Sequence, residues 1–274
     1  MSQDQQKFHF ISGLPRSGST LLAAILRQNP RFNASMMSPL ALLADNIISQ
    51  CRAGSELGPL ISQEQRKRVI RGLFHSYYQD MEGKEVIFDS NRAWTGRLPL
   101  LLDLFPGSKV VCCVRHVGWI LDSLERQYRA DPYEQTRLFS NDSDRNTVYS
   151  RMRMLASPNR LVGFSYQSLK DGFYGDRSES LILVDYDYLT KSPNAAIAKL
   201  YEALGESVFE HDFDHVEYEA KGFDSNLGVP GLHKVKPKVV HEERATVLPP
   251  DLFKEYENSP FWTDGTNTKA TIII

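Results

Sequence analysis

The sequence predicts an α/β fold: one domain with a central, mostly parallel sheet flanked by helices. Three observations predict this class. Apolar runs of strand length alternate with stretches of helical periodicity as far as residue 205. A glycine-rich loop, GLPRSGST at 13–20, stands between the first expected strand and the first expected helix. No repeat, low-complexity segment or Pro/Gly-rich linker divides the 274 residues, a length that suits one large core.

The elements follow from local pattern. Short apolar runs predict strands at 7–12, 86–89, 109–115 and 181–186. Helical spacing predicts helices at 18–28, 39–48, 62–80, 95–105, 117–130, within 143–170 and at 193–204. Ser62 and Gln65 form a capping-box pattern, and Gly205 is a typical helix stop. The pattern fades after 205, so we expect one domain over 1–274, with its core at about 7–205 and C-terminal loops, a lid and a tail over 206–274.

Composition narrows the class of protein. The net charge of -2 gives no electrostatic case for nucleic acid or an acidic membrane as the main partner. No apolar stretch reaches the length of a membrane helix, and the first residues, MSQDQQKFHF, lack the apolar core of a signal peptide. Cys51, Cys112 and Cys113 have no metal-ligand spacing and read as thiols of a reducing compartment. We therefore expect a cytoplasmic protein with no bound metal.

The 13–20 loop has the skeleton of a phosphate-binding loop. Its backbone N–H groups and the helix start would face an anion, with Pro15, Arg16, Ser17, Gly18, Ser19 and Thr20 as the binding residues. A nucleotide-triphosphate loop carries lysine where Ser19 stands, so its absence argues against a magnesium-dependent kinase or ATPase. The cation of this loop is Arg16, whose planar fork suits a terminal oxyanion.

A second anion-binding pattern follows the strand at 109–115. In RHVGWILDS, Arg115 stands at the carboxyl end of that strand, where ligands bind in parallel sheets. Ser123 lies about two helical turns further on and can face the same crevice. Two anion sites at neighbouring strand ends suit a nucleotide that is phosphorylated at both ends.

These motifs resemble those of the sulfotransferase family. GLPRSGSTLL resembles its 5′-phosphosulfate loop, RHVGWILDS its 3′-phosphate motif, and VDYDYLTKSPNAAIAKLYEALG its later strand and helix, in the same order. The resemblance covers roughly the first three-quarters of the chain. The arginine form of the loop is closer to the tyrosylprotein and bacterial branches than to the cytosolic phenol and steroid branch.

The resemblance implies a sulfotransferase-like P-loop fold and 3′-phosphoadenosine 5′-phosphosulfate (PAPS) as donor, with 3′,5′-ADP (PAP) as product. It implies in-line transfer without a metal. Arg16 would neutralise charge on the bridging oxygen and the moving sulfuryl group, while Ser19 and Thr20 donate from the helix start. Plain helix capping is the alternative role of the two hydroxyl groups.

The sequence departs from the family at the positions of the catalytic base and cation. FDSNRAW at 88–94 lies where the family has a lysine or histidine, and the Asp-Lys pair of bacterial relatives reads Asp89-Ser90 here. Asn91 and Arg92 are candidates to replace that cation, and Asp89 is the first choice as base. A structural aspartate at a strand end is the alternative for Asp89. The position of the tyrosylprotein glutamate has no carboxylate, and Asp45 lies a few residues beyond it.

Several other residues have two open interpretations. Lys234 and Lys236 match the family's late loop over the donor, or form a solvated lysine pair. Tyr186 aligns with the family's Tyr-acid-x-Leu strand, either at the donor or in the core. Two tryptophans, Trp94 and Trp119, would stack adenine, with core packing as the alternative. Three methionines would form an apolar acceptor wall or fill the core: Met36, Met37 and Met152.

The sequence therefore predicts a sulfotransferase of secondary metabolism that acts on a hydroxyl or amine of a small, natural-product type of acceptor. A protein or peptide tyrosine sulfotransferase, a P-loop kinase and a non-catalytic nucleotide-binding module are the alternatives. Binding of 3′,5′-ADP rather than ATP with Mg²⁺ separates the first from the kinase, and a transfer assay separates it from the binding module.

Overall fold

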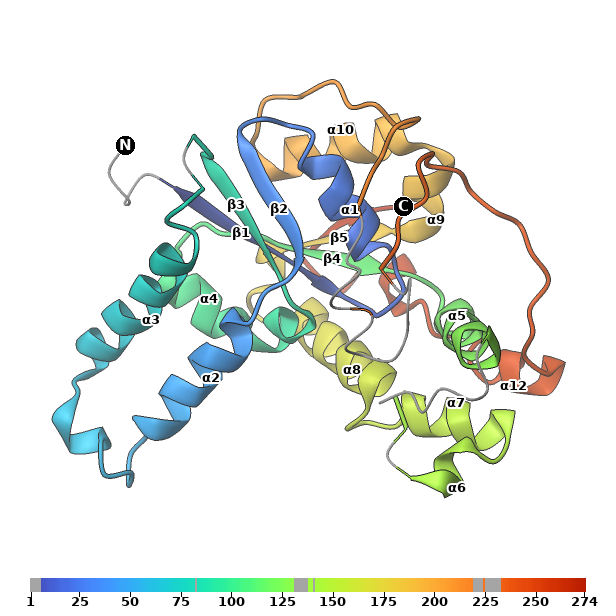
Figure 1. Ribbon diagram of the computed structural model, residues 1–274, viewed down its shortest axis with the longest axis horizontal. Helices are drawn as coiled ribbons and strands as arrows, with labels where there is room; N and C mark the ends of the chain where they lie inside the picture. The colour runs from blue at the N-terminus through green and yellow to red at the C-terminus, as the bar shows by residue number, and fades with distance from the viewer. Residues whose placement is uncertain (1–5, 82, 131–137, 140, 219–223, 225–232) are drawn as a thin grey trace.

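The computed structural model describes residues 6–81, 83–130, 138–139, 141–218, 224 and 233–274. Six strands form one sheet in the order β2-β3-β1-β4-β5-β6, and all neighbouring strands are parallel (Figure 1). The strands are β1 (Lys7–Gly13), β2 (Phe32–Met37), β3 (Val86–Ser90), β4 (Val110–Val114), β5 (Leu181–Asp185) and β6 (Thr271–Ile273). The predicted α/β class with a parallel sheet is confirmed.

The sheet is buried on both faces, which explains the uniformly apolar strands. Along β4, Val110, Cys112 and Val114 pack into one hydrophobic cluster, while Val111 and Cys113 pack into the other. Every residue of β4 is buried. This alternation is the period-2 arrangement that a strand between two helical layers requires.

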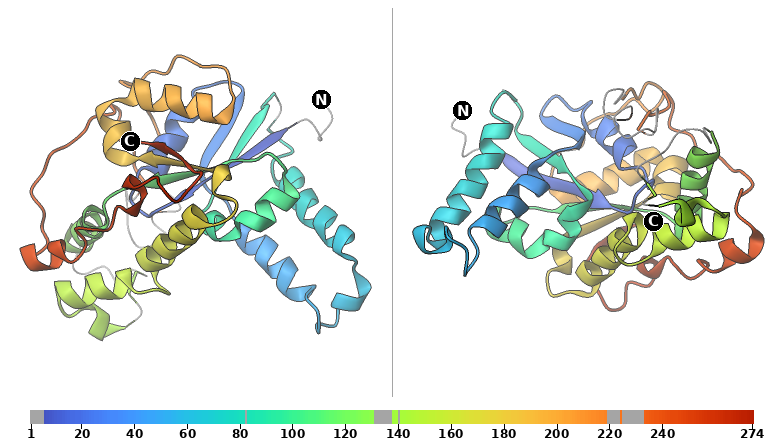
Figure 2. Two further views of the ribbon diagram at one scale, coloured as in Figure 1. Left: turned by 180° about the vertical axis from the view of Figure 1, so that it is seen from behind. Right: turned by 60° about the horizontal axis from the view of Figure 1, so that its bottom comes forward.

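Helices cover the two faces unequally (Figures 1 and 2). One face carries α1 (Ser19–Leu26), α9 (Tyr186–Lys191) and α10 (Pro193–Leu204). The other carries α2 (Leu40–Gln50), α3 (Gln63–Tyr77), α4 (Leu98–Leu104), α5 (Val117–Ala130), α6 (Asp142–Arg145), α7 (Val148–Ala156), α8 (Leu161–Tyr174) and α12 (Pro250–Lys254). Short 3₁₀ turns lie at Gly58–Leu60, Arg92–Arg97, Ser178–Ser180 and Phe261–Thr263. Helices α2 and α3 form a hairpin that projects from the sheet.

Local signals set several boundaries as predicted. The Ser62 hydroxyl accepts from Gln65 N, and the Gln65 side chain caps Ser62 in return. Helix α10 begins with Pro193 and ends at Gly205, which has a left-handed backbone with φ of 69°. Both ends use the residue types whose backbone preferences suit them.

Other boundaries differ from the sequence expectation. The helical patterns expected within 143–170 correspond to α6, α7 and α8, and the extended backbone at Ser157, just before Pro158, separates α7 from α8. The fourth expected strand ends at Asp185, whose carboxylate accepts from the N–H groups of Asp187 and Tyr188 and starts α9. Strand β6 pairs with β5, although it lies in the tail where only loops were expected.

The C-terminal part contains a further paired segment, which we name the C-terminal ribbon and define as residues 213–218 and 235–239. Val239 N donates to Phe213 O at 2.8 Å, Val216 N to Pro237 O at 2.6 Å and Val235 N to Tyr218 O at 3.2 Å. These bonds pair the two arms in antiparallel fashion. Val216 and Val239 pack into the cluster beneath α10.

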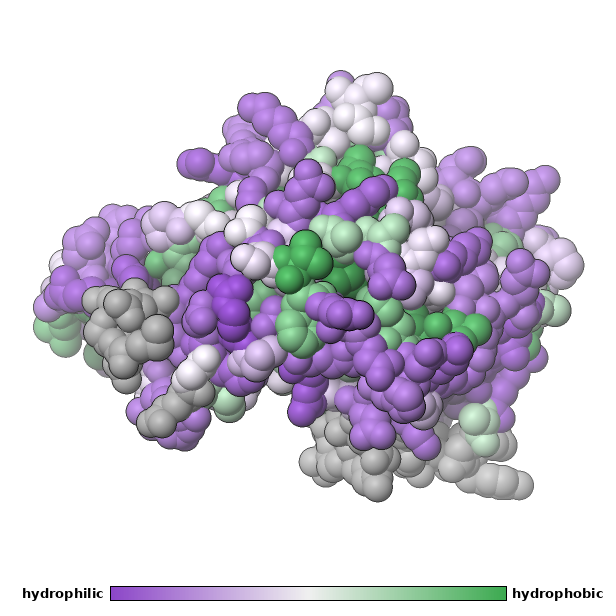
Figure 3. Space-filling view, turned by 90° about the horizontal axis from the view of Figure 1, so that it is seen from above, coloured by the Kyte–Doolittle hydropathy of each residue, from purple (hydrophilic) through white to green (hydrophobic). Residues whose placement is uncertain are grey.

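Seen from above, the surface is mainly hydrophilic, with hydrophobic side chains gathered near the middle of this face (Figure 3). Among the helices of the described ranges, none combines the length and hydropathy needed to cross a membrane. All three cysteines are buried free thiols.

Candidate active site

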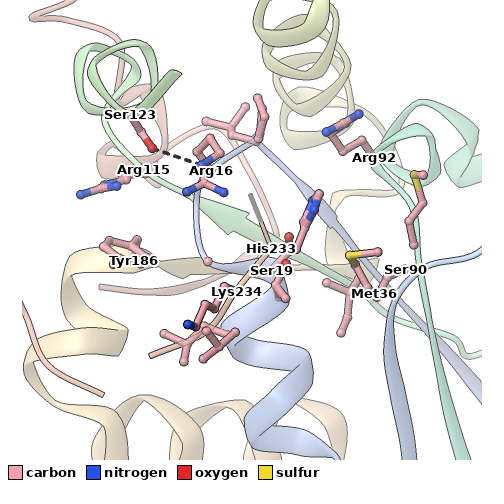
Figure 4. A pocket seen from close by; sticks show the side chains of 18 of the residues that line it. Arg16, Ser19, Met36, Ser90, Arg92, Arg115, Ser123, Tyr186, His233 and Lys234 are labelled. Carbon is pink, nitrogen blue, oxygen red and sulfur yellow. Dashed lines mark hydrogen bonds between the residues drawn. The ribbon is translucent and has the colours of Figure 1, made fainter. Parts of the chain in front are cut away.

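A cavity of about 430 Å³ opens at the carboxyl ends of β1 and β4. The order of strands changes direction at this point: β2 and β3 lie on one side of β1, and β4, β5 and β6 lie on the other. Ligands of open parallel sheets bind in the crevice that such a reversal creates. The side chains that surround it come from the loop after β1, the strand ends and the C-terminal ribbon (Figure 4).

The 13–20 loop is fixed to β4 by close backbone contact. A Cβ at Gly13 would lie 2.3 Å from the Cys113 carbonyl oxygen, and Gly13 has a φ of 104°. Only glycine tolerates both conditions. Leu14 N donates to Cys113 O at 2.9 Å. The Ser17 hydroxyl donates to the same oxygen at 2.8 Å and to Leu14 O, so its side chain holds the loop rather than facing the cavity. The predicted role of Ser17 in anion binding can rest only on its main chain.

Gly18 brings the loop into helix α1. Its φ is 93°, and a Cβ there would lie 2.8 Å from the Tyr186 ring. It is also the N-cap, so no side chain caps the first N–H groups of α1. Ser19 and Thr20 line the cavity within the first turn and are not the capping residues. The uncapped helix start and its hydroxyl groups therefore face the cavity together, an arrangement that suits an anion.

Arg16 joins the two predicted motifs. Within the described ranges, Arg16 is the one residue other than glycine that has a positive φ, which is 56°. Its Nε donates to Ser123 Oγ at 3.1 Å (Figure 4). Burial lowers the pKa of the guanidinium, and the positive charges of Arg115 and Arg244 lower it further, while Tyr186 raises it. The loop and helix α5 thus meet at one cationic site.

Arg115 lies beside this contact. Its guanidinium carbon is 4.1 Å from the Tyr186 ring centroid, a cation–π distance. Burial lowers its pKa and Arg244 lowers it further, against the favourable effects of Tyr186 and Asp187. Tyr186 is partly exposed and lines the cavity, so it stacks on Arg115 at the cavity wall instead of lying in the core. An anion placed among these cations would relieve their mutual repulsion.

Arg244 was not predicted. Its guanidinium donates to the fully buried Asp122 carboxylate at 2.7 Å. Asp122 also accepts from Thr246 Oγ1 at 3.0 Å and Val247 N at 2.7 Å. Helix α5 therefore ties down the segment that carries Arg244. No local sequence pattern indicates a role for Arg244, because its partner Asp122 lies more than a hundred residues earlier in the chain.

The remaining predicted cations lie at the cavity rim. Arg92, Lys234 and Lys236 line it, and Lys236 is paired with Glu242. Asn91 also lines it, but its amide donates to Ser38 O at 3.1 Å and accepts from Ala93 N at 3.0 Å. The Asn91 side chain thereby starts the following 3₁₀ turn, a structural duty that competes with catalysis. Residues 230–232 of the expected lid lie outside the described residues.

Asp89 needs a correction as the expected base. It is fully buried, and its carboxylate accepts from Tyr78 Oη at 2.7 Å and Trp94 Nε1 at 2.6 Å. It does not belong to the cavity lining described here. Burial raises its pKa, and the hydrogen bonds oppose that rise. Asp89 therefore joins β3 to the α3 face of the core. Asp45 pairs with Arg97 at 2.8 Å.

The structure brings a different acid–base pair to the cavity. His233 lines it, and its Nδ1 lies 2.5 Å from Oδ1 of the buried Asp224. Burial lowers the pKa of His233, Asp224 raises it, and Arg16 and Arg92 lower it further. No sequence motif indicates this pair, since its members stand nine positions apart and no local pattern marks them as partners.

One side of the cavity is apolar. Met36 and Met37 line it at the end of β2, with Leu138 and Leu161 on the helical side. Met152, expected in the acceptor wall, and Trp94, expected to stack adenine, are both buried in the core. Trp119 packs edge-on against Phe253, with ring centroids 5.1 Å apart. An arginine-rich side and an apolar side thus share one cavity, and no group of metal-ligating side chains was found in the described chain.

Known proteins resemble this chain in sequence profile and in fold. The sequence matches the profile of the sulfotransferase family over residues 9–211. Solved structures of similar fold include a sulfotransferase domain of the Synechococcus PCC 7002 olefin synthase, at 17% identity and a TM-score of 0.51, covering 92% of this chain and 94% of that one. Mouse sulfotransferase SULT7A1 complexed with PAP is 14% identical with a TM-score of 0.52, covering 94% and 86%. A sulfotransferase from Alicyclobacillus acidocaldarius is 14% identical with a TM-score of 0.51, covering 91% and 89%. No curated protein sequence matches the chain significantly.

Proposed function

Because this chain belongs to the sulfotransferase family, whose members use PAPS, we propose that it transfers the sulfuryl group of PAPS to a hydroxyl or amine of a small, largely apolar acceptor. Family membership supports sulfuryl transfer from PAPS. The residues of the cavity support the proposed donor geometry, acceptor class and residue roles. The observation that supports it most is the hydrogen bond of 3.1 Å between Arg16 and Ser123, which joins two anion-binding motifs at neighbouring strand ends.

The cationic side of the cavity suits a donor charged at both ends. We assign the 5′-phosphosulfate to the 13–20 loop and the start of α1, where Arg16, Ser19 and Thr20 lie. We assign the 3′-phosphate to Arg115 and Ser123, with Arg244 nearby. Arginine forks bind such oxyanions through paired, charge-assisted hydrogen bonds. Lys234 and Lys236 extend the positive rim.

The apolar side suits the acceptor. Met36, Met37, Leu138 and Leu161 offer adaptable hydrophobic contacts, and Arg92 lies at the boundary with the cationic side. We propose a compound with an apolar body and a single nucleophilic group, of the natural-product type. The three free thiols support a reducing, cytoplasmic location. We propose that 1–274 acts as one domain, since β6 of the tail completes the sheet.

Two measurements test this function. Titration calorimetry should show that 3′,5′-ADP binds much more tightly than ATP with Mg²⁺. Transfer of radiolabelled sulfate from PAPS should then be screened over apolar phenols, alcohols and amines, with a tyrosine peptide for comparison, and with and without EDTA. Preference for ATP, or binding of 3′,5′-ADP without transfer to any acceptor, would contradict the proposal. Preferential sulfation of the peptide would replace the acceptor class only.

A further inference from the structure

We propose that His233 is the general base that activates the acceptor, and that Asp224 is the positioning residue that fixes its tautomer. The inference rests on the proposed sulfuryl transfer and adds the base that the chain's loop and strand motifs do not supply. His233 lines the same cavity as the 13–20 loop, and the buried carboxylate of Asp224 contacts its imidazole from behind the cavity wall.

The geometry fixes where the imidazole proton lies. Asp224 is 2% exposed, and its Oδ2 accepts from the main-chain N of His233 at 2.9 Å. Its Oδ1 lies 2.5 Å from His233 Nδ1. An ionised carboxylate only accepts hydrogen bonds, so Nδ1 carries the proton. In a neutral imidazole the other nitrogen, Nε2, is then unprotonated and basic.

The imidazole lies where the two sides of the cavity meet. Figure 4 shows His233 inside the cavity with Ser19, Met36 and Arg92 around it. The charges of Arg16 and Arg92 both act on it. A group in this position can meet an acceptor held by the methionine wall while the donor occupies the 13–20 loop.

The charges around His233 favour its neutral form. Burial lowers its pKa, and the nearby cations Arg16 and Arg92 lower it further, against the opposite effect of Asp224. Lys234 follows it directly in the chain and lines the same cavity. A base must be unprotonated at the working pH, so this environment suits the assignment.

The other acidic side chains near the cavity have partners of their own. Among the described residues that line the cavity, the acidic and imidazole side chains are His233 and Glu242, and Glu242 forms an ion pair with Lys236. Asp89 is buried against Tyr78 and Trp94. His233 is therefore the group that combines a position in the cavity with a fixed tautomer.

The proposed step transfers a proton to His233 and the sulfuryl group to the acceptor. Nε2 of His233 takes the proton of the acceptor O–H as the oxygen forms a bond to sulfur. The bond between sulfur and the bridging oxygen breaks, and its electron pair stays on the phosphate oxygen of 3′,5′-ADP. The products are a sulfate ester and a nucleotide, and the imidazolium then releases its proton to solvent.

The main test is the His233→Asn variant. The asparagine amide still donates to Asp224 but cannot take a proton. We expect kcat to fall by about 10²–10⁴-fold, the usual contribution of a general base, with the Kd for 3′,5′-ADP changed by less than about threefold. A kcat within about threefold of the wild type would overturn the assignment, and so would an equal loss of 3′,5′-ADP binding. His233→Gln repeats the test if the asparagine variant does not fold.

The chain provides a matched control in a second histidine–aspartate pair. His215 Nδ1 lies 2.8 Å from Asp212 Oδ2, and its main-chain N donates to Oδ1 of the same aspartate at 3.1 Å. This pair is exposed on the ribbon and does not line the cavity. His215→Asn should leave kcat and the Kd unchanged. Comparable losses in both variants would mean that ribbon folding, not proton transfer, is being measured.

Asp224→Asn provides a readout that does not depend on activity. Removal of the carboxylate charge takes away the effect that raises the pKa of His233. An NMR titration of the imidazole should therefore show a lower pKa in the variant, and the acid limb of kcat/KM should move to lower pH by the same amount. An unchanged His233 pKa, or a rate that falls as His233 loses its proton at high pH, would overturn the proposal.

These experiments distinguish a failure of the His233 assignment from a failure of the proposed sulfotransferase function. If the wild type neither binds 3′,5′-ADP nor transfers sulfate, the proposed function fails and the dyad with it. If the wild type transfers sulfate and His233→Asn does so equally fast, only the dyad fails. Restoration of transfer by added imidazole in His233→Ala, without restoration in Arg16→Ala, would support the proton-transfer role.

Discussion

At the scale of single residues, the proposed donor site depends mainly on two arginine side chains, and their positions suit different roles. Arg16 stands in a left-handed backbone conformation within the loop and is tied to Ser123. Arg115 stacks on Tyr186, one strand away. Backbone strain at a non-glycine residue is typical of functional sites, where surrounding structure holds it in place. The two arginines therefore invite separate tests.

Substitution of Arg115 should change nucleotide selectivity. If it binds the 3′-phosphate, Arg115→Ala loses a charge-assisted contact, which costs about 1.5–3 kcal/mol of binding. Calorimetry should show 3′,5′-ADP weakened by that amount and 5′-AMP, which lacks the 3′-phosphate, weakened much less. Arg52→Ala, at an exposed arginine outside the cavity, is the control and should change neither. An equal loss for both nucleotides would remove the 3′-phosphate assignment.

Substitution of Arg16 should act on the rate more than on binding. Negative charge grows on the bridging oxygen as the sulfuryl group leaves, so the interaction with Arg16 is stronger in the transition state. We expect Arg16→Ala to lower kcat by roughly 10²–10³-fold, the scale of one lost oxyanion donor. The affinity for 3′,5′-ADP should fall less, because main-chain N–H groups still hold the phosphate. Steady-state kinetics with saturating donor measure this.

Arg16→Lys keeps the charge without the fork and should recover part of the lost rate. Alanine and lysine both carry a Cβ, as arginine does, so the strained backbone at φ of 56° is common to all three proteins. If Arg16 only braces the loop, the alanine variant will lose stability and nucleotide affinity together while kcat survives. That result would take Arg16 out of the mechanism.

Sequence reasoning singled out the loop residues and Arg115, which the structure brings to one cavity, because their signals are local. The 13–20 loop and Arg115 are marked by their own strand and helix context. Arg244 and the Asp224–His233 pair are not, since each depends on partners that only tertiary folding supplies. The error at Asp89 has the same origin. Its sequence position shows a strand end but not the Tyr78 and Trp94 donors that enclose it.

At the scale of elements, helices with clear periodicity and strands with continuous apolar runs were predictable, whereas paired segments that are very short or partly polar were not. Strand β6 has three residues, and β2 contains the polar Asn33 and Ser35, so neither has a strong strand pattern. The C-terminal ribbon is held by main-chain hydrogen bonds that leave little trace in the sequence. Tyr218 Oη also accepts from Met36 N at 2.9 Å, which attaches one arm of the ribbon to β2 beside the apolar side of the cavity.

The ribbon should respond to nucleotide. Lys236 and Lys238 lie on its second arm and Lys234 directly before it, and all three are exposed and line the cavity. We expect trypsin to cleave after Lys234 and Lys238 in the free protein, since Pro237 blocks cleavage after Lys236. Bound 3′,5′-ADP should slow that cleavage several-fold, because a bound anion restrains the segment. Mass spectrometry of a digestion time course locates the cuts. Cleavage at exposed Lys254, on α12 outside the cavity, should keep its rate. Equal rates at the ribbon in both states would argue against a lid.

At the scale of the whole molecule, the cavity draws on segments from most of the chain. Its lining runs from Ile11 in β1 to Glu242 beyond the ribbon, and the sheet itself closes only with β6. Two hydrophobic clusters lie on opposite faces of the same strands, so neither can persist when the sheet is lost. Folding and site assembly are therefore one process, and a ligand of the site should stabilise the entire chain.

We expect a single thermal unfolding transition whose midpoint rises with 3′,5′-ADP. A ligand that binds only the folded state at about 100 times its Kd adds about 2.7 kcal/mol. For a chain of this size that corresponds to a rise in Tm of about 5–10 °C. Scanning calorimetry measures both the number of transitions and the shift. At equal concentration, 5′-AMP and ATP with Mg²⁺ should shift the Tm less, because they lack the 3′-phosphate that Arg115 and Ser123 would hold. Higher salt should reduce every shift, since the site is built from charges. Two transitions with only one moved by 3′,5′-ADP would show that the cavity and the sheet unfold separately, against the coupling that the shared strands imply.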